Sequence, residues 1–186
     1  MKTPVIFFGL LFLSQASMQA QGVFNTSLNE SLSAIISETP NGFANIKGDL
    51  KYSRSGAKHY QSKVEIEDAV ECMVSLSEKE HKGIWNAIIL ETSVFEEAEY
   101  RYRTVFDEIS KTIIRPAGEK PYILHGEFGK PRPDMKTVYS RFSLLPSSGK
   151  LKNVVVMLAL EYESKIFRLS IHVLQEEEYK LADAGY

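Results

Sequence analysis

The chain has few of the residues that mark common secreted scaffolds or nucleic-acid-binding proteins. A single cysteine, Cys72, stands in 186 residues, so no disulfide can form within the chain, although small secreted animal domains often carry several. The charges nearly balance, at 22 basic and 24 acidic residues, and nucleic-acid binding would show as a basic surplus. These absences argue against a disulfide scaffold and against a nucleic-acid partner, and the single cysteine favours a bacterial exported protein.

Sequence motifs for catalysis, metals and cofactors are also missing. The four histidines are His59, His81, His125 and His172, and no two have a spacing that would place two metal ligands on one helix face. There is no glycine-rich phosphate loop and no Gly-x-Ser-x-Gly turn. We therefore predict no metal, no cofactor and no catalytic residue that the sequence can name.

Long hydrophobic runs are absent after the first residues. Lys2 precedes a nine-residue apolar run, residues 5–13, and small residues follow up to Ala20. This is the pattern of a secretory signal peptide, and the run is shorter than the roughly 20 residues that span a bilayer. We predict a signal peptide over residues 1–20, with Ala16 as a second cleavage site, and a single α+β domain over residues 21–186. The protein is expected to be soluble, in the periplasm or outside the cell.

Two stretches have the apolar spacing of helices. After Ser27 and Glu30, which have the form of a capping box, the first stripe is Leu28, Leu32, Ile35 and Ile36, and residues 39–42 end the helix. A second capping box, Ser93 and Glu96, precedes the stripe Phe95, Ala98, Tyr102, Val105, Phe106, Ile109 and Ile113, and Pro116 ends this helix.

The remaining segments predict strands joined by short turns. The expected strands are residues 43–51, 60–67, 70–76, 84–90, 122–128, 138–145, 154–160 and 166–174. The connections are too short for the long crossovers that parallel strands need. We therefore predict an α+β fold: an antiparallel β-sheet with two helices packed on one face.

Short motifs in the first half resemble a group of bacterial proteins. The segment from Asn41 to Gly48 contains Phe-Ala-Asn-Ile-Lys-Gly, and Tyr60 to Lys63 reads Tyr-Gln-Ser-Lys. Over about residues 28–113 the chain is similar to small exported α+β proteins of Bacteroidetes-type bacteria, an uncharacterised group. The resemblance implies export and an α+β fold, and it carries over no catalytic residue.

Five residues are the candidates for a binding site. Tyr100, Arg101 and Arg103 lie together on the second helix, partly off its apolar stripe, and exposed tyrosine and arginine side chains are common in binding hot spots. Arg168 and His172 lie on the polar side of the last strand. In both cases an ordinary solvated surface is the simpler interpretation.

Strand 154–160 is apolar on both faces, which leaves one face of the sheet to be covered. Val155, Met157 and Ala159 form this second face, and residues from 84–90 would extend it. The cover could be the curled sheet itself, a second copy of the chain in a homodimer, a small apolar ligand or another protein.

We hypothesise a non-enzymatic exported binding module. The alternative is an exported hydrolase that uses dispersed histidines and carboxylates, in which two or more of His59, His125, His172 and the acidic residues on strands would converge in one cleft. Cys72 is not favoured as a nucleophile, because its neighbours Val70, Val74 and Leu76 indicate a small buried residue.

Overall fold

A computed structural model of the chain describes residues 27–77, 83–116 and 118–176. Its helices are α1 (Ser27–Ser37) and α2 (Phe95–Ser110), and a short 3-10 helix, η1 (Thr39–Asn41), follows α1. The strands are β1 (Lys47–Arg54), β2 (Ala57–Ser62), β3 (Glu71–Ser77), β4 (Gly83–Thr92), β5 (Ile113–Ile114), β6 (Tyr122–Gly126), β7 (Thr137–Leu145), β8 (Val154–Glu163) and β9 (Ile166–Gln175). The predicted signal peptide and His81 lie outside the described residues.

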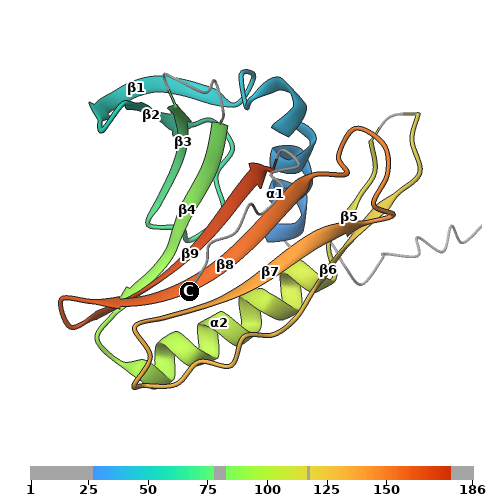
Figure 1. Cartoon of the computed structure of the whole chain (residues 1–186). Helices are drawn as coiled ribbons and strands as arrows, with labels where there is room; N and C mark the ends of the chain where they lie inside the picture. Colours follow the sequence, from blue (N-terminus) through green and yellow to red (C-terminus); the bar gives the residue numbers. More distant parts are fainter. Residues whose placement is uncertain (1–26, 78–82, 117, 177–186) are drawn as a thin grey trace, which may run out of the picture.

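All nine strands of the described chain belong to one antiparallel sheet, in the order β1-β2-β3-β4-β9-β8-β7-β6-β5. The last strand in the sequence therefore lies in the centre, between β4 and β8. Figure 1 shows the sheet strongly curved, with both helices on the same side of it. The predicted antiparallel sheet with two helices packed on one face is confirmed.

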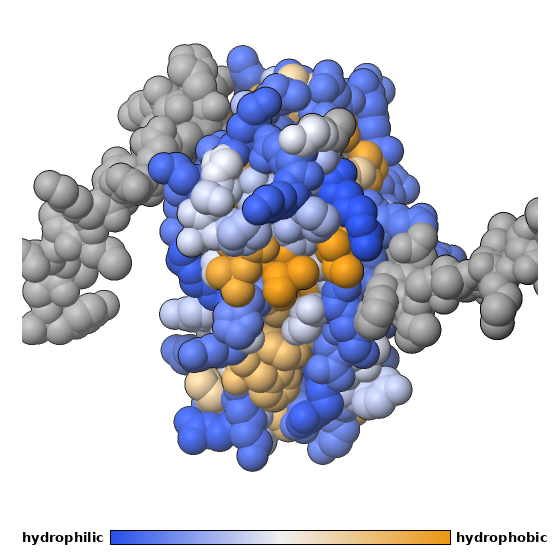
Figure 2. Space-filling view, turned by 90° about the vertical axis from the view of Figure 1, so that its right-hand side faces the viewer, coloured by the Kyte–Doolittle hydropathy of each residue, from blue (hydrophilic) through white to orange (hydrophobic). Residues whose placement is uncertain are grey.

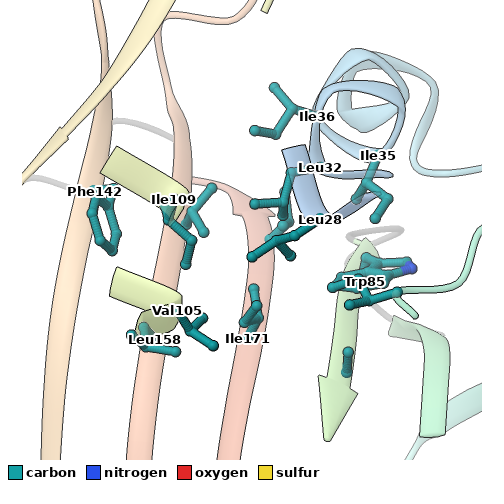
Figure 3. Packing of buried hydrophobic residues seen from close by; sticks show 14 of the residues in the cluster. Leu28, Leu32, Ile35, Ile36, Trp85, Val105, Ile109, Phe142, Leu158 and Ile171 are labelled. Carbon is teal, nitrogen blue, oxygen red and sulfur yellow. The ribbon is translucent and has the colours of Figure 1, made fainter. Parts of the chain in front are cut away.

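The core fills the space between the helices and the concave face of the sheet. From α1, Leu28 and Leu32 point toward Ile171 on β9, while Val105 and Ile109 of α2 lie near Leu158 and Phe142 (Figure 3). All four predicted apolar residues of α1 are buried. Apolar side chains alternate along each strand with a period of two, so one face supplies this core and the other points away.

The end of α1 follows the predicted stop signal. Pro40 lies in η1, and Gly42 ends that turn with a φ of 58°, in the left-handed region that glycine tolerates best. Phe43 follows with a positive φ of 62°, so the chain is still turning there. The prediction of a strand from residue 43 is wrong for this reason, and β1 begins at Lys47.

The second helix is shorter than its apolar stripe. It ends at Ser110, and Ile113 and Ile114 pair instead with Ile123 and Tyr122 of β6. The prediction that the helix continues to Pro116 is therefore wrong. Two adjacent β-branched residues favour a strand, and a proline disfavours helical backbone in the residue before it.

The start of α2 also differs from the predicted capping box. Val94 is the N-cap residue and makes no side-chain capping bond. The hydroxyl oxygen of Thr92 accepts a hydrogen bond from the Val94 N–H at 3.2 Å, and its O–H donates to the Glu97 carboxylate at 2.6 Å. Thr92 thus fixes the chain at the start of α2 by bonding the N-cap residue and the first turn, without a side-chain cap on the helix itself.

Two further strand boundaries shift. The predicted strand 60–67 is β2, which ends at Ser62, because the Ser62 hydroxyl bonds both the N–H and the carbonyl of Val64 and turns the chain. In β4, an irregularity between Ile88 and Leu90 turns Leu90 toward the core. Beyond it, Glu91 is paired with Arg168 of β9.

Candidate binding surfaces

The face of the sheet that points away from α1 and α2 is the first candidate, and we call it the outer face. Its central row crosses five strands in register, from Arg141 through Met157, His172 and Asn86 to Met73. The rows on either side contain Ser143, Val155, Leu174, Ile84 and Ser75, and Tyr139, Ala159, Ser170, Ile88 and Glu71. The predicted second apolar face of strand 154–160 therefore exists and extends over its neighbours.

The outer face mixes apolar and polar side chains, and its apolar side chains are only partly covered. Val155 and Ala159 are buried, whereas Met157, Ile88 and Leu174 are half-buried. Ile84 is 40% exposed and Tyr139 is 62% exposed. The central strands thus present apolar side chains on a face that no described helix covers.

The outer face extends to the β5 edge of the sheet. Ile113, Ile123 and Leu145 are paired in register across β5, β6 and β7, and their neighbours Ile114, Tyr122 and Leu144 point into the core. Figure 2 looks onto the side that carries β5 and β6, and apolar side chains gather across its middle. Ile123 is 48% exposed, so this edge adds an accessible apolar group.

Polar side chains form short hydrogen-bonded groups within the outer face. The ring of Tyr52 stacks on His59 with centroids 4.5 Å apart, and His59 Nδ1 lies 2.8 Å from the hydroxyl of Ser75. The Ser75 hydroxyl in turn donates to Asn86 Oδ1 at 3.4 Å. This group lies on β1 to β4. Its members form hydrogen bonds and a ring contact with one another beside the apolar side chains of the outer face.

His172 lies beside Asn86 on the same face. Its Nε2 is 2.9 Å from the hydroxyl of Ser170, and burial lowers the pKa of its imidazole, while the charge of Glu161 acts in the opposite direction. His172 is thus held by a neighbour on its own strand.

Arg168 lies nearer the end of the outer face. Its Nε donates to the carboxylate of Glu91 at 2.7 Å. Together with Glu161 and Glu163 it lines a hollow of about 300 Å³. Arg168 and His172 are four residues apart on β9, or about 13 Å at the usual rise of a strand, so they do not form one contact site.

The three predicted residues on α2 lie on the other side of the sheet from Arg168 and His172. Tyr100 is 72% exposed, and Arg103 lies over the ring of Phe128, 5.1 Å from its centroid. Arg101 lines a cavity of about 180 Å³ together with Glu67, Asp68 and other residues. The five predicted binding residues are therefore not brought together.

The histidines that the hydrolase hypothesis needs are also apart. His59, His125 and His172 belong to β2, β6 and β9. Three steps in the strand order separate His172 from each of the others, which is about 14 Å at the usual strand spacing. Within the described residues, no group of three histidine, cysteine or acidic side chains could hold a metal ion.

Cys72 lies in the core, as its apolar neighbours indicated. It is buried on β3, paired with Ala87 of β4, and burial raises the pKa of its thiol. A neutral, enclosed thiol is a poor nucleophile. Val70 differs from the prediction, since it is 60% exposed just before β3 begins.

A further cavity involves residues that sequence reasoning missed. It measures about 390 Å³ and lies where η1, the segment after β5 and the β7–β8 connection meet. Arg115 and Lys150 contribute its positive charges and Glu119 its carboxylate. Arg115 and Glu119 are far from Lys150 in the sequence and share no motif with it, so no sequence pattern could have grouped the three.

Comparison with protein-family models, with curated proteins and with solved structures finds no match for this chain. Among the described residues, no helix has the length and apolar character needed to cross a membrane. Any functional argument therefore rests on the geometry of the chain itself.

Proposed function

We propose that the protein is an exported, non-enzymatic binding module and that its outer face holds a protein partner. The observation that carries this proposal is the register of Ile84, Leu174 and Val155, which continues the apolar surface across three central strands, β4, β9 and β8. Exposed apolar patches of this kind are typical of interaction sites. A protein surface suits it better than a small ligand, because the face is broad and the hollow beside Arg168 lies at its end.

The placement of the chemical groups also supports binding over catalysis. The histidines stand strands apart on the outer face, and Cys72 is enclosed in the core on the opposite side. A general base and a nucleophile need to lie within hydrogen-bond reach of each other or of one substrate.

The test is native mass spectrometry of the protein purified without denaturant from its own host. We expect a mass above that of the bare chain, and we expect Ile84→Lys combined with Ile123→Lys to remove the excess. Val94→Lys is the matched control, because Val94 is also an exposed apolar residue, 49% accessible, but lies at the start of α2. The control should retain the partner.

The measured mass also separates the alternatives. A mass twice that of the chain would identify a second copy as the partner, and an excess of a few hundred daltons would point to a small apolar ligand. A bare chain in the wild type, or an unchanged complex in the double variant, would contradict the proposal.

Export is part of the same proposal and has its own test. If the signal peptide is removed after Ala20, the mature chain begins at Gln21. The N-terminus of the protein from its host should therefore be Gln21, or residue 17 if Ala16 is the site. Recovery of the chain with residues 1–16 still attached would contradict export through this signal.

A further inference from the structure

The cavity at the β5 edge has walls that the core holds in place. Arg115 follows Ile114, which is fully buried, and Lys150 precedes Leu151, which is 4% exposed. Both cations therefore project from backbone anchored by an adjacent core residue. The cavity is larger than the one beside Arg101 and lies within the range of about 300–1,000 Å³ that is usual for ligand pockets.

Tyr122 holds the Glu119 side of the cavity in place. Its hydroxyl lies 2.7 Å from Glu119 Oε2 and 3.0 Å from the carbonyl oxygen of Ser148, which ties the β7–β8 connection to β6. Gly149 has a φ of 80°, and a Cβ atom there would come within 2.2 Å of the Tyr122 hydroxyl. The turn can therefore approach Tyr122 this closely only because residue 149 is glycine.

The cavity has a net positive charge, because two cations, Arg115 and Lys150, face one carboxylate, that of Glu119. Within the described residues, neither the Arg115 guanidinium nor the Lys150 ammonium makes a hydrogen bond or ion pair, and the nearby Glu119 carboxylate is engaged by Tyr122. Arginine and lysine are the side chains that bind carboxylate and phosphate groups in proteins. Leu151 and Pro116 supply apolar surface beside them.

We propose that this cavity binds a small organic anion. Its carboxylate or phosphate group lies between Arg115 and Lys150, and its apolar part lies against Leu151 and Pro116. The amide of Asn41, which also lines the cavity, offers a neutral donor to the same group. This site is separate from the outer face and does not depend on the function proposed for that face.

The test uses hexanoate and hexyl phosphate as probes and 1-hexanol as their uncharged counterpart. Each is titrated into the ¹⁵N-labelled protein, and the backbone amide signals are followed by NMR. We expect saturable shifts at Arg115 and Leu151 with at least one of the two anions and much weaker binding of hexanol. The anion that binds more tightly identifies which group the site prefers.

Charge-removing variants separate this site from general attraction of anions. Arg115→Gln and Lys150→Gln should each weaken binding about tenfold, the usual effect of losing one charge-assisted hydrogen bond. Lys152→Gln is the matched control, because Lys152 is exposed in the same connection and does not line the cavity. It should leave the affinity unchanged.

Three results would overturn the proposal. One is the absence of saturable shifts with both anions. Another is equal affinity of the Lys150→Gln variant and the wild type. The third is binding of hexanol as tight as that of the anions. Because the substituted side chains are exposed, unchanged amide spectra of the free variants will show that the fold is intact.

Discussion

The indole N–H of Trp85 donates a hydrogen bond of 2.9 Å to the hydroxyl oxygen of Ser62, and both residues are buried. The same hydroxyl bonds the backbone N–H and carbonyl of Val64. The Ser62 side chain thus provides the acceptor for the buried indole N–H of Trp85 on β4, and it also turns the chain at the end of β2.

Ser62→Ala should therefore destabilise the protein by about 1–3 kcal/mol, because the Trp85 N–H is left buried without an acceptor. Urea unfolding followed by tryptophan fluorescence measures this, since Trp85 is the only tryptophan in the chain. Ser53→Ala, at an exposed position on β1, is the control. Equal stability of the two variants would show that the bond contributes nothing.

The sequence correctly predicts the elements whose apolar residues recur at a regular spacing and are all buried on one face of the element. In α1, Leu28, Leu32, Ile35 and Ile36 all lie in the core, and in β7 Val138, Ser140, Phe142 and Leu144 are buried in alternation with exposed residues. The spacing of such residues is a local property that burial on one side imposes. This spacing can therefore be recognised in the sequence alone.

Boundaries and sites depend on contacts between distant segments, which spacing does not encode. Ile113 continues the helical stripe of α2, yet it pairs with Ile123, ten residues further on. Arg115 and Lys150 line the same cavity only because the segment after β5 and the β7–β8 connection lie side by side. Local sequence indicates the binding candidates on α2 and on β9, but the two sets of side chains lie on opposite sides of the sheet.

Thr112 joins the two helices through a buried bond. Its hydroxyl donates to Asn29 Oδ1 at 2.7 Å, linking α1 to the residue that follows the end of α2. Thr112→Val keeps the shape of the side chain but removes this donor, and it should lower the free energy of unfolding by about 1–2 kcal/mol. Thermal unfolding followed by circular dichroism is the measurement.

Thr137→Val is the control for that change, because Thr137 is exposed at the start of β7. It should leave the stability nearly unchanged. If Thr112→Val were as stable as the control, the bond between Thr112 and Asn29 would contribute nothing measurable to stability.

Cys72 should be unreactive in the folded protein. Burial raises the pKa of its thiol, so little thiolate is present, and the core excludes reagents. With Ellman's reagent at mildly alkaline pH, we expect no release of colour from the native protein and one equivalent per chain after addition of urea. Rapid reaction without denaturant would show that β3 opens or that the thiol has access to solvent.

His172 should make the protein less stable in mild acid. Because burial lowers the pKa of its imidazole from the ordinary value of 6.5, the unfolded chain takes up a proton at a higher pH than the folded protein does. The contribution of His172 to stability is therefore fully present above pH 6.5 and is lost as the pH falls through the lower folded value. The free energy of unfolding from urea titrations at several pH values will show this loss.

The variant His172→Gln isolates this effect from the titration of the carboxylates. It cannot be protonated, so its stability should fall less steeply than that of the wild type as the pH is lowered below about 6.5. His125→Gln, at an exposed position of the outer face, controls for the loss of an imidazole as such. Identical pH profiles for His172→Gln and the wild type would mean that His172 accepts a proton in the folded protein as readily as in the unfolded chain. The imidazole beside Asn86 would then be open to solvent, and a partner on the outer face would meet a charged group there in mild acid.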